Sequence, residues 1–235
     1  MKKIPYTSFL PVYLLVLIGF LLAAIGGSRA VTAWSASAPV KDRKTVVIDA
    51  GHGGVDGGAT SCTGVLESQF NLEIATKLND FMHLLGIQTH MIRETDCSVY
   101  TQGETISQKK ISDLRERVRI VNSIEDCVLI SIHQNHFSDS KYSGAQVFYP
   151  ATTGSRELST KLQENIKKTL NPDSHRQIKK ADGIYLMQNI NCPGALIECG
   201  FLSNPQEEYL LRSDDYQQKL CSVIACTVST WVWGT

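Results

Sequence analysis

The sequence predicts one α/β domain in three layers, with helices on both faces of a mostly parallel or mixed central sheet of about six strands. From residue 45 onward, short apolar runs alternate with amphipathic stretches, a pattern typical of strands covered by helices. The chain has 235 residues and a hydrophobic share of 43%, enough to bury one substantial core. No internal repeat or low-complexity stretch is visible in the sequence, which excludes a solenoid.

Six segments have the apolar or alternating character of strands. They cover residues 45–49, 87–92, 128–132, 144–149, 184–187 and 195–197. The first and third are rich in β-branched residues and short enough to be buried strands. Pro150 closes the fourth segment, and the turn-forming residues 189–194 separate the last two.

Five segments have the apolar spacing or the terminal residues of helices. They cover residues 68–85, 111–121, 155–170, 207–212 after Pro205, and 216–231. Gly86 supplies a stop for the first helix, and Ser112 is a candidate cap for the second. The polar segment between Arg93 and Lys109 has little periodicity, so we expect a surface loop beside the functional site.

The first thirty residues predict a signal peptide or an uncleaved signal anchor. Lys2 and Lys3 precede an uncharged, mostly apolar stretch over residues 9–25, nearly long enough to span a bilayer. The small residues 36–38 offer a cleavage site, and both outcomes stay open. The two lysines would keep their end in the cytoplasm, so the remainder is expected to be exported. Residues 31–44 are then a linker before the folded part, 45–235.

The charge and the cysteine content argue against a nucleic-acid-binding protein and against a disulfide framework. Lys plus Arg and Asp plus Glu both total 23, and no run of like charges suggests a nucleic-acid surface. Seven cysteines occur, with no CxxC pair, and several lie inside apolar runs. We therefore expect most of them to be reduced and structural, in a weakly oxidising compartment if the domain is exported.

Two histidines lie where predicted strands end. His52 follows the strand 45–49 within Asp49–Gly54, and His133 follows the strand 128–132 within Ser131–Asn135. Ligands collect outside the carboxyl ends of strands in open α/β sheets. Glu67, at the head of a helical stretch, is a candidate third ligand, and Glu198 ends another apolar run. Two imidazoles and one carboxylate around a divalent ion leave a position for water, as in catalytic zinc sites.

These motifs resemble the zinc-dependent N-acetylmuramoyl-L-alanine amidases of bacterial cell walls. The resemblance covers about residues 45–230, in the order of the family's motifs. It is carried by Asp49–Gly54, Glu67, Ser131–Asn135 and Glu198–Asn204, with Arg93, Asp96, Leu114, Arg117 and Asn122 matching further positions. The segment 183–198 and the apolar leader are similar to the germination-specific spore-cortex branch of that family.

The resemblance implies a zinc amidase catalytic domain at residues 45–235. His52, Glu67 and His133 would bind Zn²⁺, and Glu198 would act beside the metal as general base and acid. The bond cut would join the lactyl group of N-acetylmuramic acid to the L-alanine of the peptidoglycan stem peptide. In the spore-cortex branch the product would lead to muramic-δ-lactam, with a separate deacetylase in the same pathway and an accessory activating protein as a further possible partner. The enzyme would be membrane-anchored or secreted, at the cell wall or in the forespore intermembrane space.

Other residues carry open alternatives. Asn135, Arg93 and Arg117 are candidate substrate contacts, although both arginines fit equally well as ion-pair partners inside the fold. Gln134 and His136 depart from the family's usual small residues, which predicts a differently shaped pocket wall. His83, His90 and His175 have no motif around them and are expected to be ordinary surface or helix residues.

Three rival functions can be weighed on the sequence. Another zinc peptidase or deacetylase of the cell wall would use the same ligands and differs only in the family motifs. A catalytically silent wall-binding protein predicts loss of one of His52, Glu67, His133 or Glu198, and all four are present. Nucleotide binding is disfavoured, because the glycines at 51, 53, 54, 57 and 58 match neither GxGxxG nor GxxxxGK[ST].

Overall fold

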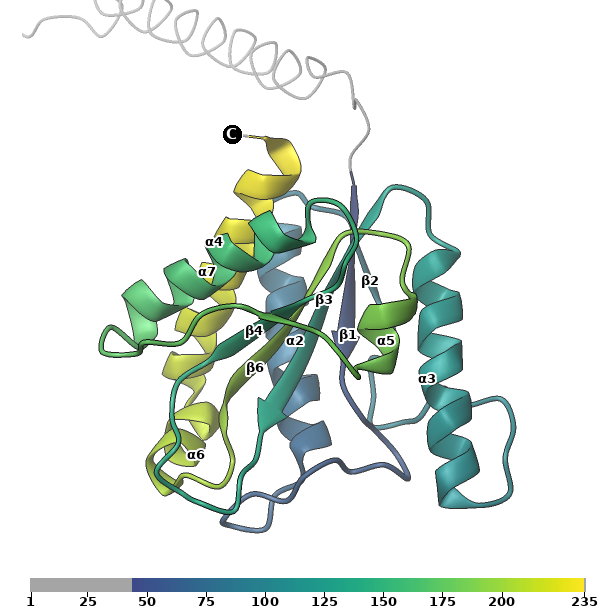
Figure 1. The fold of residues 1–235 in the computed structure, drawn as a ribbon, viewed down its shortest axis with the longest axis horizontal. Helices are drawn as coiled ribbons and strands as arrows, with labels where there is room; N and C mark the ends of the chain where they lie inside the picture. Colours follow the sequence, from purple (N-terminus) through teal and green to yellow (C-terminus); the bar gives the residue numbers. More distant parts are fainter. Residues whose placement is uncertain (1–43, 235) are drawn as a thin grey trace, which may run out of the picture. The chain divides into compact units, whose positions relative to one another are not determined.

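The computed structural model of the chain describes residues 44–234 (Figure 1). The expected leader at 1–30 and all of the expected linker except Lys44 lie outside the described residues. Within residues 44–234, no helix combines the length and the hydropathy needed to cross a bilayer.

The centre of the fold is a mixed sheet of six strands (Figure 1). The strands are β1 (Thr45–Ala50), β2 (Thr89–Met91), β3 (Cys127–Asn135), β4 (Gln146–Tyr149), β5 (Lys179–Lys180) and β6 (Gly194–Phe201), in the order β2-β1-β3-β6-β4-β5. Strands β2, β1, β3 and β6 are parallel, whereas β4 runs antiparallel to β6. The sequence prediction of a mostly parallel or mixed sheet is therefore confirmed.

Six helices cover the two faces of the sheet within the described part of the chain. They are α2 (Glu67–Leu84), α3 (Ile106–Asn122), α4 (Ser155–Leu170), α5 (Tyr185–Asn189), α6 (Pro205–Arg212) and α7 (Asp214–Trp233). One apolar core joins the sheet to α2, α4 and α7, and a second joins the opposite face to α3 and α5. Helices thus cover both faces, and the three-layer prediction is confirmed.

The strand order changes direction at β1, because β2 is added on one side of β1 and β3 on the other. From β1 the chain passes through α2 to β2 on one side, and from β2 it returns through α3 to β3 on the other side of β1. At such a reversal the loops that leave the two carboxyl ends diverge, which opens a crevice for ligands. The residues that follow β1 and those that end β3 meet at this position.

One predicted strand is wrong, and one observed strand was not predicted. Residues 185–187 of the expected strand 184–187 belong instead to α5, where consecutive side chains Leu186 and Met187 are both buried, as a helix turn allows and a half-buried strand does not. The sixth strand is β5, a short exposed pair of lysines with no apolar signal in the sequence. The β-propensity of residues 184–187 is overridden by the packing of α5 against α3. The side chain of Asn122, the last residue of α3, donates a hydrogen bond to the carbonyl of Asn189, the last residue of α5.

The second predicted helix begins earlier than expected. Helix α3 starts at Ile106, and Thr105 forms a capping box with Gln108, whose side chain accepts from the Thr105 backbone amide. Ser112, expected as the cap, is buried inside the helix, and its hydroxyl accepts from the amides of Thr101 and Gln102. The loop after β2 is correspondingly shorter than predicted.

Candidate metal centre and active site

His52 lies in the loop that follows β1 and adopts a left-handed backbone conformation, with φ of 60°. Such a conformation is uncommon outside glycine and costs about 1–3 kcal/mol, a strain that clusters at functional sites. Its Nδ1 lies 2.9 Å from Oδ2 of Asp56, and its Nε2 lies 3.3 Å from Oε2 of Glu67. The Asp56 contact holds the proton on Nδ1 and leaves Nε2 free to coordinate a cation.

Glu67 is the first residue of α2 and is almost fully buried. Its carboxylate accepts hydrogen bonds from the amides of Ala59 and Gln134, at 3.0 and 3.2 Å, and from the Asn71 side chain at 3.2 Å. Burial raises the pKa of Glu67, but the hydrogen bonds with His133 and His52 outweigh it and hold the pKa well below its usual range. The helix amino terminus also favours a negative charge here. Glu67 is therefore ionised and held in position, as a metal ligand must be.

His133 comes from β3, and its Nδ1 lies 3.0 Å from Oε1 of Glu67. The two imidazole rings are 5.0 Å apart between centroids, nearly perpendicular at 75°. Gly51 makes this approach possible, because a β-carbon at that position would lie 2.2 Å from the His133 ring. A second glycine serves the same purpose: a β-carbon at Gly58 would lie 2.6 Å from Oε2 of Glu67.

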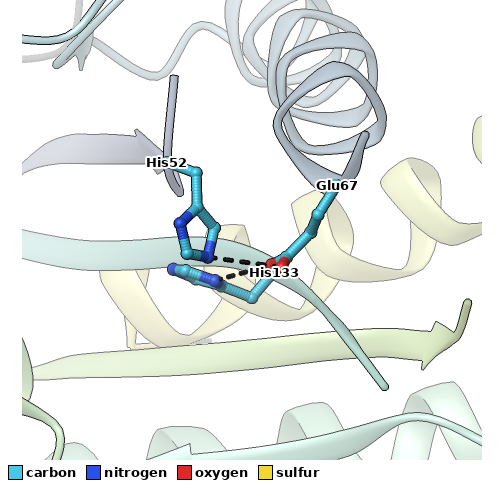
Figure 2. A group of neighbouring side chains, drawn as sticks. All are labelled: His52, Glu67 and His133. Atoms are coloured by element: carbon cyan, nitrogen blue, oxygen red, sulfur yellow. Dashed lines mark hydrogen bonds and ion pairs between the residues drawn. The ribbon is translucent and has the colours of Figure 1, made fainter. Parts of the chain in front are cut away.

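The three side chains converge from three separate elements (Figure 2). One ligand atom from each of His52, Glu67 and His133 lies within 4.8 Å of the others. Two imidazole nitrogens and a carboxylate oxygen are donors that suit Zn²⁺. The glycines that admit these side chains, and the Asp56 contact that fixes one imidazole, also fit a metal centre. Without a cation, the two neighbouring carboxylates outweigh the effect of burial and raise the pKa of His52 to about 9, so the cluster favours positive charge.

Glu198 lies on β6, opposite His133 in the register of the parallel pair β3 and β6. Its Oε2 is buried and has no hydrogen-bond partner among the described residues. Burial, assisted by the charge of Glu67, raises the pKa of Glu198 to about 7. A buried polar atom without a partner is rare and points to a molecule that it would bind.

The two histidines and Glu198 line one cavity. It has a volume of about 370 Å³, and its apolar side chains come from α3, β6 and the segment at the start of α5. The apolar members are Leu114, Ile184, Leu186 and Leu196. Polar groups that converge in a largely apolar cavity are typical of a binding site. A larger cavity of about 920 Å³ lies beside β4 and α4 and contains none of the expected site residues.

The structure favours a structural role for Arg117, one of the three candidate substrate contacts. Arg117 is buried, and its guanidinium donates to Asp49, Asp113 and the carbonyls of Ala50 and His52. Four of its N–H donors are thus directed at the protein, although Arg117 borders the cavity. These contacts favour the alternative of an ion-pair partner inside the fold.

Arg93 shows the same pattern with backbone acceptors. Its guanidinium donates to the carbonyls of Ala50, Gly51, Ser68 and Thr95. It thereby holds the loop that carries His52 against the start of α2. Asn135 ends β3 beyond a register shift and is not among the residues that line the cavity.

Gln134 and His136 do not shape the cavity wall as expected. Gln134 is buried on the other face of β3, where its side-chain amide donates to Asn71 at 3.2 Å. His136 is exposed, and neither residue lines the cavity.

Sequence reasoning missed two residues of this site. Asp56 orients His52, and Lys110, which lines the cavity, forms an ion pair of 2.7 Å with Asp56. Asp56 lies four residues after His52 in a glycine-rich loop, and this spacing is the only feature of the sequence that could have identified it. No feature of the sequence identifies Lys110, because only the tertiary fold brings α3 to the loop.

The fold and the site together define a class: a three-layer α/β domain with a candidate mononuclear metal centre and an adjacent acid at the carboxyl ends of its parallel strands. The chain belongs to the N-acetylmuramoyl-L-alanine amidase family, whose model matches residues 46–229. This agrees with the resemblance that the motifs carry.

Relatives and solved structures agree with this membership. The chain is 37% identical to the germination-specific N-acetylmuramoyl-L-alanine amidase of Bacillus subtilis, over 95% of this chain and 92% of the relative. The CwlD amidase of Clostridioides difficile, solved in complex with the GerS lipoprotein, is 38% identical, with a TM-score of 0.78 over 82% of this chain and all of that one. An N-acetylmuramoyl-L-alanine amidase of Clostridium difficile 630 is 30% identical, with a TM-score of 0.71 over 83% of this chain and all of that one.

Proposed function

We propose that this protein is a zinc-dependent peptidoglycan amidase of the spore cortex. It hydrolyses the amide bond between the lactyl group of N-acetylmuramic acid and the L-alanine of the stem peptide. The observation that carries the proposal is the convergence of His52, Glu67 and His133 within 4.8 Å, next to a cavity that Glu198 lines together with the two histidines. Family membership supports the choice of the bond that is cut, and the germination-specific relative supports the spore cortex as the substrate.

Each side chain has a distinct task in this reaction. His52, Glu67 and His133 would hold Zn²⁺, which supplies Lewis-acid activation of water and of the scissile carbonyl. Glu198 accepts the proton of the attacking water and returns it to the leaving nitrogen of L-alanine. Its buried position keeps its pKa near neutrality, where a carboxyl group can both take up and give back a proton. Asp56 keeps His52 in the tautomer that presents Nε2 to the ion.

The cavity explains how the stem peptide would be held. Leu114 of α3 and Ile184 and Leu186 of the α5 region form an apolar wall that faces the reacting groups. Lys110 adds one cation at the rim, suited to a carboxylate of the peptide. An apolar wall with few polar groups orients a substrate and excludes water from the reacting groups.

The relatives support a setting at the cell wall. We place the folded domain outside the cytoplasm, attached through the apolar leader or secreted, at the cell wall or between the forespore membranes. There its product, muramic acid freed of peptide, would be the substrate of a deacetylase on the way to muramic-δ-lactam. The relative solved with a lipoprotein supports an accessory partner for this enzyme as well.

Digestion of purified peptidoglycan by the full chain tests the proposal. The expected products are peptides with a free amino terminus on L-alanine and glycan with bare muramic acid, both identified by mass spectrometry. The release of these peptides should stop after treatment with a chelator and should return when Zn²⁺ is added. Release of acetate would instead identify a deacetylase, cleavage within the peptide a peptidase, and intact peptidoglycan with bound protein a silent wall-binding protein.

A further inference from the structure

Two cysteines lie at the end of the sheet opposite to the proposed active site. Cys127 begins β3, and Cys192 lies two residues before β6. The same two strands carry His133 and Glu198 at their other ends. The proposed catalytic mechanism uses neither thiol.

The parallel register places the two cysteines side by side. The register begins at Leu129 and Gly194, and the Leu129 amide donates to the Pro193 carbonyl at 2.9 Å. The same offset, continued two residues back along both segments, sets Cys127 opposite Cys192. Both belong to the apolar core on the α3 and α5 face, so their side chains leave the sheet in the same direction. Neighbouring strands lie about 4.8 Å apart, within the span of about 4.4–6.8 Å between the α-carbons of bridged cysteines.

The two side chains pack in the same apolar core. Cys192 lowers the pKa of Cys127, and Cys127, together with burial, raises the pKa of Cys192. The pair borders a cavity of about 260 Å³, whose other walls include Lys44, Asn122 and Asp126. Cys127 is only 3% exposed, whereas Cys192 is partly exposed, so this cavity is the route by which a small reagent reaches the sulfur atoms.

We propose that Cys127 and Cys192 form a reversible disulfide that joins β3 to β6 when the domain meets a small organic disulfide. The inference does not depend on the proposed amidase activity, because it rests on the strand register, the shared apolar core and the shared cavity of the two cysteines.

The step is a thiol–disulfide exchange. The thiolate of one of the two cysteines attacks one sulfur of the small disulfide, forms a mixed disulfide and releases one small thiol. The other cysteine then loses its proton and attacks the protein sulfur of the mixed disulfide, which expels the second small thiol. The two protein thiols give up two electrons and two protons in total, and the small disulfide is reduced to two thiols.

The other cysteines lack this combination of features. Cys62, Cys97 and Cys226 are exposed, and none of them borders a described cavity or shares a strand register with another cysteine. Cys199 and Cys221 are buried in the core that faces α2, α4 and α7. The exposed cysteines therefore serve as internal controls for unselective oxidation.

The test uses the full chain, reduced and then incubated in a mild detergent with 2-hydroxyethyl disulfide at mildly alkaline pH. After alkylation and proteolysis, mass spectrometry should find a peptide that links Cys127 to Cys192 and is lighter by two hydrogen atoms than the two free peptides. The thermal midpoint should rise by roughly 5 °C or more and return when a reducing agent is added. Circular dichroism during incubation verifies that the protein stays folded.

The matched variants are Cys192→Ser and Cys62→Ser. Cys62→Ser should form the bridge and show the reversible shift, whereas Cys192→Ser should show neither. Separate alkylation of Cys127 and Cys192 in protein whose Cys62 has reacted with the reagent would overturn the proposal. A reversible midpoint shift that persists in Cys192→Ser would overturn it as well.

Discussion

Glu198 and His133 occupy paired positions on the neighbouring parallel strands β6 and β3. Paired residues direct their side chains to the same face of a sheet, so the carboxyl group and the imidazole share one cavity. The register of two strands therefore places an acid beside a candidate metal ligand, and this acid is not among the three residues whose ligand atoms cluster.

This relationship predicts different losses for the two residues. Glu198→Ala should keep its Zn²⁺ and lose activity by about 10²–10⁴-fold, because a proton acceptor is removed and the three ligands remain. His133→Ala should lose both metal and activity. Zinc content and amidase rate of the purified variants check this, with the exposed Glu157→Gln as control. Equal metal loss in both variants would refute the division of roles.

Asp56 should control metal affinity through His52. Asp56→Asn removes the anion that holds the Nδ1 proton of His52, so the affinity for Zn²⁺ should fall by about 10–100-fold. Competition with a chromophoric chelator measures the dissociation constant. Asp139→Asn, at an exposed aspartate that pairs with Lys141, should leave the constant unchanged. An unchanged constant in Asp56→Asn would show that the contact does not orient the ligand.

Arg117 should contribute to folding more than to substrate binding. Its guanidinium is buried between Asp49 and Asp113, and removal of one partner from a buried ion pair costs about 3–5 kcal/mol. Arg117→Met should therefore lower the free energy of unfolding in urea, whereas Arg119→Met, at an exposed pair with Glu116, should change it little. A raised KM with unchanged stability in Arg117→Met would restore the role of substrate contact.

The same network predicts a dependence of stability on acid. Burial raises the pKa of Asp49, but the charges of Arg117 and His133 and the hydrogen bonds from Ser131 and Arg117 together outweigh it and hold the pKa below its ordinary value of 3.8. The folded state then binds fewer protons than the unfolded state, so this stabilisation is present above about pH 4 and is lost as the pH falls through the folded pKa.

Urea unfolding of metal-free protein between about pH 3 and pH 6 measures this effect. The free energy of unfolding should fall more steeply with acid in the wild type than in Asp49→Asn. The double variant Asp49→Asn with Arg117→Met removes the unpaired arginine and keeps the comparison possible if the single variant unfolds. Identical slopes in all three proteins would exclude Asp49 as the titrating group.

Periodicity alone predicted much of the fold. The strand signals at β1, β3 and β6 are short apolar runs, and the helix 155–170 has helical apolar spacing; all four elements are present in the structure. The segment 184–187 misled the prediction, since its residues suit a strand and a short helix equally, and only the space against α3 decides between them. The two lysines of β5 carry no local signal, because an exposed edge strand needs no apolar residues.

The sequence by itself determined the donors: two histidines at strand ends, a glutamate at a helix start and an acid at the end of another apolar run, within motifs of one family. It did so because the chemistry of a ligand and its place at an element end are both local properties. The tertiary structure alone decided that the three candidate ligands converge within 4.8 Å, that Asp56 orients His52, and that both arginines direct most of their donors into the fold. These are distances between residues far apart in the chain, and only the register and packing of the sheet set them.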